Sequence, residues 1–234
     1  MPDHTAEFPG SQIYWEARYS MGGNSGAGSY NRLAQYKAAV INDFVQKNQI
    51  SSVIEHGCGD GNQLGLSNYP QYSGFDVSPT AVQKCQVRYK DDATKSFRVA
   101  DAYAGEIAEL TLSLDVIYHL IEDQVFEAYM RRLFDSSSKF VIIYSSDNAN
   151  YNLSFSAPHV KHRAFSEWAE KMFPIWKLVD HVPNIYPYNV DDPHNTSLAE
   201  FFVYQKPMHK KQTGKTLRRR RRPAIIKEDV TFSD

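Results

Sequence analysis

Residues 53–62 read VIEHGCGDGN, and this stretch decides the fold: three glycines at alternate positions follow a short apolar strand. Glycine permits a tight turn, and its bare backbone lets a ligand approach the amide N–H groups and the start of the following helix. A lone glycine loop is most simply a turn between a strand and a helix. Its place directly after a strand makes it a candidate binding loop of a parallel α/β sheet.

Acidic side chains follow the next three apolar strands. Asp76 lies 21 residues after Glu55, at the end of the second strand, where a carboxylate can accept hydrogen bonds from both ribose hydroxyls of a nucleoside. Asp101 and Ala102 follow the third strand, and Asp115 follows the fourth. Because the carboxyl ends of parallel strands meet at one edge, these groups predict a nucleoside-containing ligand there.

Apolar patches of strand and helix spacing alternate from about residue 30 onward, which predicts one layered domain with a parallel α/β sheet. The expected helices cover residues 33–45, 79–89, 122–134 and 165–172. The seven expected strands cover residues 52–55, 72–76, 97–99, 110–114, 140–144, 176–181 and 199–204. Only about ten residues separate Gly61 from the second strand, so the first crossover helix must be short.

Composition is that of a globular protein able to bury a core: 234 residues, 42% hydrophobic and 23% charged. The sequence contains neither an apolar run of about 20 residues for a membrane span nor a basic and apolar N-terminal secretion signal. Two cysteines are too few for a disulfide framework. We therefore expect a soluble, cytoplasmic protein.

Charge divides the chain. Residues 206–234 contain ten basic and three acidic residues, against 26 and 27 in the whole chain, so the body is acidic and the tail basic. We predict an N-terminal covering segment (1–30), a folded domain (31–205) and a basic tail (206–234). The five arginines at 218–222 are most simply a solvated extension, and the alternative is an anionic partner.

The form E-x-G-x-G-x-G at residues 55–61 resembles the first motif of class I S-adenosylmethionine-dependent methyltransferases, and the resemblance covers roughly residues 30–205. It implies a Rossmann-like, mostly parallel, seven-stranded sheet flanked by helices, with the last strand antiparallel, and S-adenosylmethionine as cofactor. Asp76 matches the ribose-binding acid, Asp101 the adenine-side acid, and residues 113–120, SLDVIYHL, the fourth-strand motif. The implied cofactor-binding residues here are Glu55, Gly57, Cys58, Gly59, Asp76, Val77, Asp101, Ala102 and Asp115.

The N-terminus has a narrower resemblance. Residues 14–19, YWEARY, and 22–30, GGNSGAGSY, are similar to a bacterial and viral subgroup of these methyltransferases found with glycan-building enzymes. A glycine-rich segment flanked by aromatic residues can close over a bound cofactor. We predict that Arg18 meets the cofactor carboxylate, that Tyr14 or Tyr19 covers its apolar face, and that Ser25 joins this set. The alternative is a disordered leader.

Methyl transfer to a hydroxyl requires a base, and histidine is suited to that role. His119 lies five residues past the fourth strand, and His159 and His162 follow the fifth. Each is a candidate, although a single histidine is more often structural. An unperturbed pKa near 6.5 predicts an ionisation near neutrality. Asp115 is a further catalytic candidate that orients the base or touches the cofactor.

Other chemistries receive less support. Asp115, Asp147 and His119 could supply Mg²⁺ ligands, but no spacing demands a metal, and none is predicted. Cys58 reads as a small loop residue, because no partner base accompanies it.

The leading prediction is an enzyme, a cytoplasmic methyltransferase that O-methylates a small-molecule acceptor, a sugar or a glycan precursor. One alternative is an RNA methyltransferase recruited by the Arg-rich tail; another is a cofactor-binding scaffold without turnover. Nucleic-acid enzymes that methylate amino groups usually carry an Asn-Pro-Pro-Tyr type motif after the fourth strand, but residues 114–117 read LDVI here. This difference weakens the RNA alternative.

Overall fold

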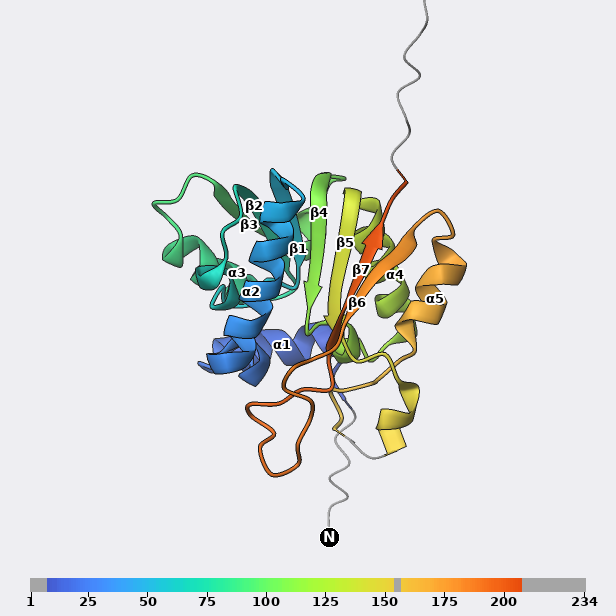
Figure 1. Cartoon of the computed structure of the whole chain (residues 1–234). Coiled ribbons are helices and arrows are strands. Elements are labelled where there is room, and N and C mark those ends of the chain that lie inside the picture. The colour runs from blue at the N-terminus through green and yellow to red at the C-terminus, as the bar shows by residue number, and fades with distance from the viewer. Residues whose placement is uncertain (1–7, 154–156, 208–234) are drawn as a thin grey trace, which may run out of the picture.

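The computed structural model describes residues 8–153 and 157–207 and contains one seven-stranded sheet. The strands are β1 (Ser52–His56), β2 (Gln71–Asp76), β3 (Lys95–Val99), β4 (Ala108–Leu114), β5 (Ser137–Ser145), β6 (Lys177–Val182) and β7 (Glu200–Gln205). They lie in the order β3-β2-β1-β4-β5-β7-β6 (Figure 1). The first five pair in parallel, and β7 runs antiparallel to both β5 and β6. The predicted Rossmann-like fold is confirmed.

Five α-helices accompany the sheet in the described residues: α1 (Ser11–Ser20), α2 (Asn31–Lys47), α3 (Pro79–Arg88), α4 (Asp123–Asp135) and α5 (Phe165–Met172). Ile41 of α2 and Val82 of α3 belong to the core on one face, whereas Met130 of α4 and Phe165 of α5 belong to the core on the other. The last four helices match the predicted ranges within about two residues. The short β1–β2 crossover is confirmed, because a 3₁₀ helix of four residues, Gln63–Leu66, takes the place of an α-helix.

Helix α1 was not predicted, and the way its first turn is hydrogen-bonded explains why. Its N-cap is Gly10 at φ 98°, which supplies no side-chain cap. Glu122 instead accepts a hydrogen bond from the Ser11 backbone N–H at 2.9 Å, across 111 residues of sequence. A helix whose first N–H groups are satisfied by a distant carboxylate leaves no capping signal in its own sequence.

The carboxyl edge of the sheet is where α1 lies (Figure 1). In the middle of the helix, Glu16 accepts hydrogen bonds from the hydroxyls of Ser78 and Thr80 at the start of α3. At the first residue of the helix, Ser11 contacts the loop between β4 and α4. The helix therefore bridges the edge where the predicted ligand site lies. Among the described residues, none of the helices is both long and apolar enough to cross a membrane.

Candidate functional site

A cavity of about 550 Å³ opens at the carboxyl edge of the sheet, beneath α1. This volume lies within the range of about 300–1,000 Å³ that is usual for small-molecule sites. The cavity brings together most of the predicted site residues: Ser25, Glu55, Gly57, Cys58, Gly59, Asp76, Val77, Asp101, Asp115 and His119. Within the described chain, the predicted residues Tyr14, Arg18, Ala102 and His159 do not line it.

The glycine loop is packed so closely that side chains would not fit. Gly57 and Gly59 have φ values of 85° and 57°, a region that other residues rarely adopt. A Cβ at Gly57 would lie 2.4 Å from a methyl carbon of Val116, and one at Gly59 would lie 2.3 Å from the Ser25 hydroxyl oxygen. The glycines thus let the loop pack against the residues that follow β4 on one side and against the N-terminal segment on the other.

Asp76 ends β2 with its carboxylate buried in the cavity wall. It accepts hydrogen bonds from the backbone N–H groups of Gly59 and Ser78, both at 2.9 Å. Burial raises the pKa of Asp76 to about 6, although these hydrogen bonds oppose the rise. Each carboxylate oxygen can accept a further hydrogen bond, so two ribose hydroxyls can be received here. Val77 and Asp101 line the same part of the edge.

Asp60 joins the N-terminal segment to the glycine loop. Its carboxylate accepts hydrogen bonds from the Ser25 backbone N–H at 3.0 Å and the Tyr30 hydroxyl at 2.8 Å. Its own N–H donates to the Ser25 hydroxyl at 3.0 Å. Asp60 and Tyr30 were not predicted as site residues, because the hydrogen-bond partners are 30 to 35 residues apart in the chain. The segment predicted to cover the cofactor is therefore fastened to the predicted binding loop.

The aromatic and basic residues of α1 have different surroundings. Trp15 and Tyr19 line the cavity, whereas the ring of Tyr14 stacks on His159 with centroids 4.8 Å apart. Arg18 Nε donates to the Asn24 carbonyl oxygen at 2.7 Å. The predicted contact of Arg18 with the cofactor carboxylate stays a prediction, and Tyr19 is better placed than Tyr14 to cover a ligand.

Asp115 follows β4 at φ 60°, and two groups hold its carboxylate. The ammonium of Lys37, a fully buried residue of α2, lies 2.5 Å from Oδ2, and the Tyr118 hydroxyl donates to Oδ1 at 2.8 Å. Glu55 lines the same cavity and accepts a hydrogen bond from the Tyr72 hydroxyl at 2.7 Å. Burial raises the pKa of Glu55 to about 7. Lys37 was not predicted, because nothing in the α2 sequence distinguishes it from a surface lysine.

His119 is the predicted base that the structure places at the cavity. Its Nδ1 lies 2.9 Å from the backbone carbonyl oxygen of His159. A carbonyl only accepts, so Nδ1 carries the hydrogen, and in the neutral ring Nε2 keeps its lone pair. Burial lowers the pKa of His119 to about 4. The predicted ionisation near neutrality is therefore corrected for His119: desolvation keeps the ring neutral well below pH 7.

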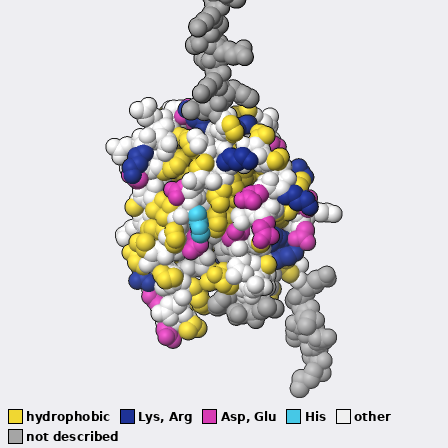
Figure 2. Space-filling view, turned by 45° about the vertical axis from the view of Figure 1, so that its right-hand side comes forward, with side chains coloured by type: hydrophobic (Ala, Val, Ile, Leu, Met, Phe, Trp, Pro, Cys, Tyr) yellow, Lys and Arg dark blue, Asp and Glu magenta, His cyan; other side chains and the backbone are white. Residues whose placement is uncertain are grey.

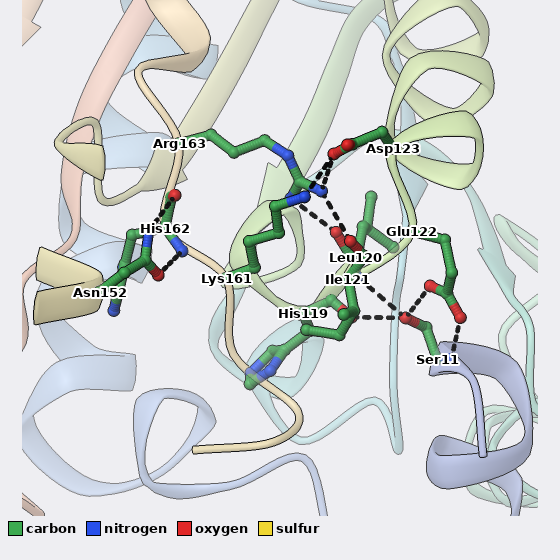
Figure 3. A network of polar contacts seen from close by, with 10 residues as sticks. All are labelled: Ser11, His119, Leu120, Ile121, Glu122, Asp123, Asn152, Lys161, His162 and Arg163. Carbon is green, nitrogen blue, oxygen red and sulfur yellow. Dashed lines mark hydrogen bonds and ion pairs between the residues drawn. The ribbon is translucent and has the colours of Figure 1, made fainter. Parts of the chain in front are cut away.

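The other two candidate histidines, His159 and His162, do not line the cavity. The ring of His159 is stacked between those of Tyr14 and His119, and its centroid is 5.6 Å from that of His119. His162 is buried, with Nδ1 2.6 Å from the Ser146 hydroxyl oxygen and its backbone N–H on Asn152 (Figure 3). Burial lowers the pKa of both histidines. The geometry fits His159 as a support for His119 and His162 as a structural residue.

No group of three or more metal-ligating side chains forms a candidate metal site in the parts of the chain that the structure describes. Asp147, a candidate Mg²⁺ ligand in sequence, accepts hydrogen bonds from the backbone N–H and the hydroxyl of Ser166. The thiols of Cys58 and Cys85 are free and buried. The Arg-rich tail at 218–222 lies outside the described residues.

Comparison with known proteins gives structural matches. No family profile and no curated protein sequence matches the chain. The N-methyltransferase NodS from Bradyrhizobium japonicum WM9, solved with S-adenosyl-L-homocysteine, superposes with a TM-score of 0.63 at 13% identity, covering 86% of this chain and 100% of that one.

Two further solved structures are similar. The methyltransferase domain of bacterial CtHen1 matches with a TM-score of 0.57 at 19% identity, over 74% of this chain and 98% of that one. Magnesium protoporphyrin IX methyltransferase from Synechocystis PCC 6803, with bound S-adenosyl-L-homocysteine, matches with a TM-score of 0.57 at 13% identity, over 74% and 83%. The chain therefore has the class I fold of S-adenosylmethionine-dependent methyltransferases.

Proposed function

We propose that this chain is an S-adenosylmethionine-dependent methyltransferase that methylates a hydroxyl group. One observation carries the proposal: a single cavity joins the glycine loop and the Asp76 and Asp101 side chains to the neutral His119. The ribose would lie on Asp76, the adenine between Val77 and Asp101, and the methionine portion along Gly57 and Gly59. In this proposed arrangement the sulfonium would lie on the side of the cavity that His119 lines.

The charge of the cavity suits such a cofactor. Five acidic residues line it, namely Glu55, Asp76, Asp101, Asp115 and Glu122. S-adenosylmethionine carries a positive sulfonium and an ammonium group, which carboxylates in a desolvated cavity favour. Similar folds have been solved with S-adenosyl-L-homocysteine or S-adenosylmethionine bound, which supports this choice of cofactor.

The reaction would be an in-line displacement. When bound, S-adenosylmethionine would supply the methyl group: the acceptor oxygen would bond to the methyl carbon as the carbon–sulfur bond breaks, and the electron pair of that bond would stay on the sulfur of S-adenosylhomocysteine. Nε2 of His119, whose Nδ1–H is held by the His159 carbonyl, would take the hydroxyl proton. A base with a pKa of about 4 is weak, so the alignment of acceptor and methyl group contributes most of the barrier reduction.

For the acceptor we propose a sugar or glycan precursor. The support is the resemblance of the N-terminal segment to glycan-associated methyltransferases, together with the Trp15 ring in the cavity wall, because aromatic rings offer apolar faces to ligands. On the face drawn in Figure 2, Lys and Arg side chains are interspersed with acidic ones rather than gathered in a patch. This charge pattern does not favour broad docking of RNA on that face. The two free, buried cysteines suit the proposed cytoplasmic location.

The test begins with the full chain and calorimetry against S-adenosylmethionine. Labelled cofactor is then offered with nucleotide-sugars, glycans and RNA in parallel. Label transfer to a carbohydrate hydroxyl is expected. Transfer to RNA would replace the acceptor class, tight cofactor binding without transfer to any acceptor would favour the scaffold, and lack of cofactor binding by folded protein would overturn the proposal.

A further inference from the structure

The start of α1 is attached to the loop that carries His119 (Figure 3). The Ser11 hydroxyl lies 2.8 Å from the His119 carbonyl oxygen and 2.7 Å from the Glu122 carboxylate, and it accepts the Ile121 N–H at 3.2 Å. Ser11 is buried. A buried hydroxyl that contacts three residues of one loop fixes the position of that loop relative to the helix.

The same loop is held on its opposite side by the segment between β5 and α5. The Lys161 backbone N–H donates to the Tyr118 carbonyl oxygen at 2.8 Å. The Arg163 guanidinium donates to the carbonyl oxygens of Leu120 and Ile121, at 2.6 and 3.0 Å. These contacts come from the folded domain itself. Residues 118–122 therefore lie between a domain segment and α1, and α1 belongs to the predicted N-terminal covering segment.

Helix α1 also shields the His119 ring. The Trp15 ring meets it edge-on with centroids 4.9 Å apart, and Tyr14 stacks on His159, which in turn stacks on His119. The charged or titratable groups that act on His119 are His159, Asp115 and Arg18, but burial is the largest cause of its lowered pKa. Helix α1 contributes to that burial through the Trp15 ring, which contacts His119 directly.

We propose that Ser11 is a positioning residue for His119: by docking the start of α1 onto the loop after β4, it keeps the imidazole away from water with Nδ1 on the His159 carbonyl. The N-terminal covering segment would then set the position and protonation of His119 as well as cover the cofactor. His119 would then have the form suited to accept a proton from the methyl acceptor only when α1 is docked on the loop after β4. The catalytic meaning of this inference rests on the proposed function, whereas the docking itself does not.

The experiment needs no acceptor. Full-length protein labelled with ¹³C and ¹⁵N is titrated from pH 8 to pH 5, and the ring signals of His119 are identified by their loss in His119→Gln. In the wild-type protein His119 should stay neutral through this range, with nitrogen shifts of the Nδ1–H tautomer. In Ser11→Ala its midpoint should rise by about one pH unit or more toward the unperturbed value near 6.5, and the tautomer preference should weaken.

Ser20→Ala is the matched control, because Ser20 is an exposed serine of the same helix whose hydroxyl bonds only within α1. It should leave His119 unchanged. Glu122→Gln loosens the same docking without removing packed atoms and should move the midpoint in the same direction. If Ser11→Ala does not fold, the His119 midpoint in Glu122→Gln still tests the proposal. Wild-type behaviour of His119 in a folded Ser11→Ala or Glu122→Gln protein would overturn the proposal. Calorimetry on the same samples tests cofactor binding separately, so failure of the proposed function is recognised independently.

Discussion

The two halves of the cavity are built in different ways. The proposed cofactor half comes from the carboxyl ends of β1, β2 and β3, where Gly59, Asp76 and Asp101 follow one another within about fifty residues. In the proposed catalytic half, Lys37 meets Asp115 across 78 residues, and Ser11 meets His119 across 108. The first half rests on local turns and the second on tertiary packing. Substitutions remote from the cavity should therefore disturb the catalytic half more readily.

His119→Gln should have the largest effect. If His119 takes the acceptor proton, turnover should fall by about 10²–10⁴-fold, while the cofactor Kd stays nearly constant because the cofactor half is built separately. Since the pKa of His119 lies at about 4, wild-type turnover should not depend on this group above about pH 6 and should fall below about pH 5. Steady-state kinetics with an acceptor found by the labelling screen measures both effects.

The control for this substitution is His181→Gln, because His181 is an exposed residue of β6 paired with Glu200. It should leave turnover unchanged. Equal turnover of His119→Gln and His181→Gln would exclude His119 as the base and would leave alignment or Asp115 as the source of catalysis.

Lys37→Met should lower the free energy of unfolding, because Lys37 holds Asp115 in the proposed catalytic half. Removing one partner of a buried ion pair leaves an unpaired charge, which costs about 3–5 kcal/mol. Lys47 offers a matched control on the same helix, because its pair with Asp43 is exposed, with side-chain exposures of 72% and 57%. Lys47→Met should cost only about 0.3–0.5 kcal/mol. Urea unfolding measures the difference.

The double variant Lys37→Met with Asp115→Asn should regain a large part of the lost stability, because it leaves no buried charge unpaired. A single Lys37→Met protein as stable as Lys47→Met would show that the ion pair does not hold Asp115 in place.

Asp76→Ala should act on the cofactor half alone. Loss of charge-assisted hydrogen bonds to the ribose should weaken binding by about 1.5–3 kcal/mol, or about 10–150-fold. Because burial raises the pKa of Asp76 to about 6, wild-type affinity should increase as pH rises through about 6 and then level off. The variant should lack this contribution. Calorimetry from pH 5 to pH 8 tests both, with Asp91→Ala, an exposed aspartate that does not line the cavity, as control.

Some features of the site follow from sequence because neighbours along the chain create them. The alternation of strands and helices, the glycine loop and the acid after β2 were all predicted, since periodicity and turn chemistry are properties of short segments. The placement of Val77, Asp101 and Asp115 followed from the rule that parallel strands end at one edge. What could not be predicted is α1, because its N-terminal hydrogen bond comes from Glu122.

The sequence by itself determined the fold and the predicted cofactor edge, because these depend on spacing within single βα units. Only the tertiary structure decided which lysine is buried, which tautomer His119 adopts and that Tyr14 stacks on His159 instead of lining the cavity. It also decided that His119 is neutral at pH 7, since desolvation depends on the surrounding aromatic rings and not on the residues beside it in the chain. Contacts between distant segments set hydrogen-bond partners and solvent access, and no local pattern of residues encodes them.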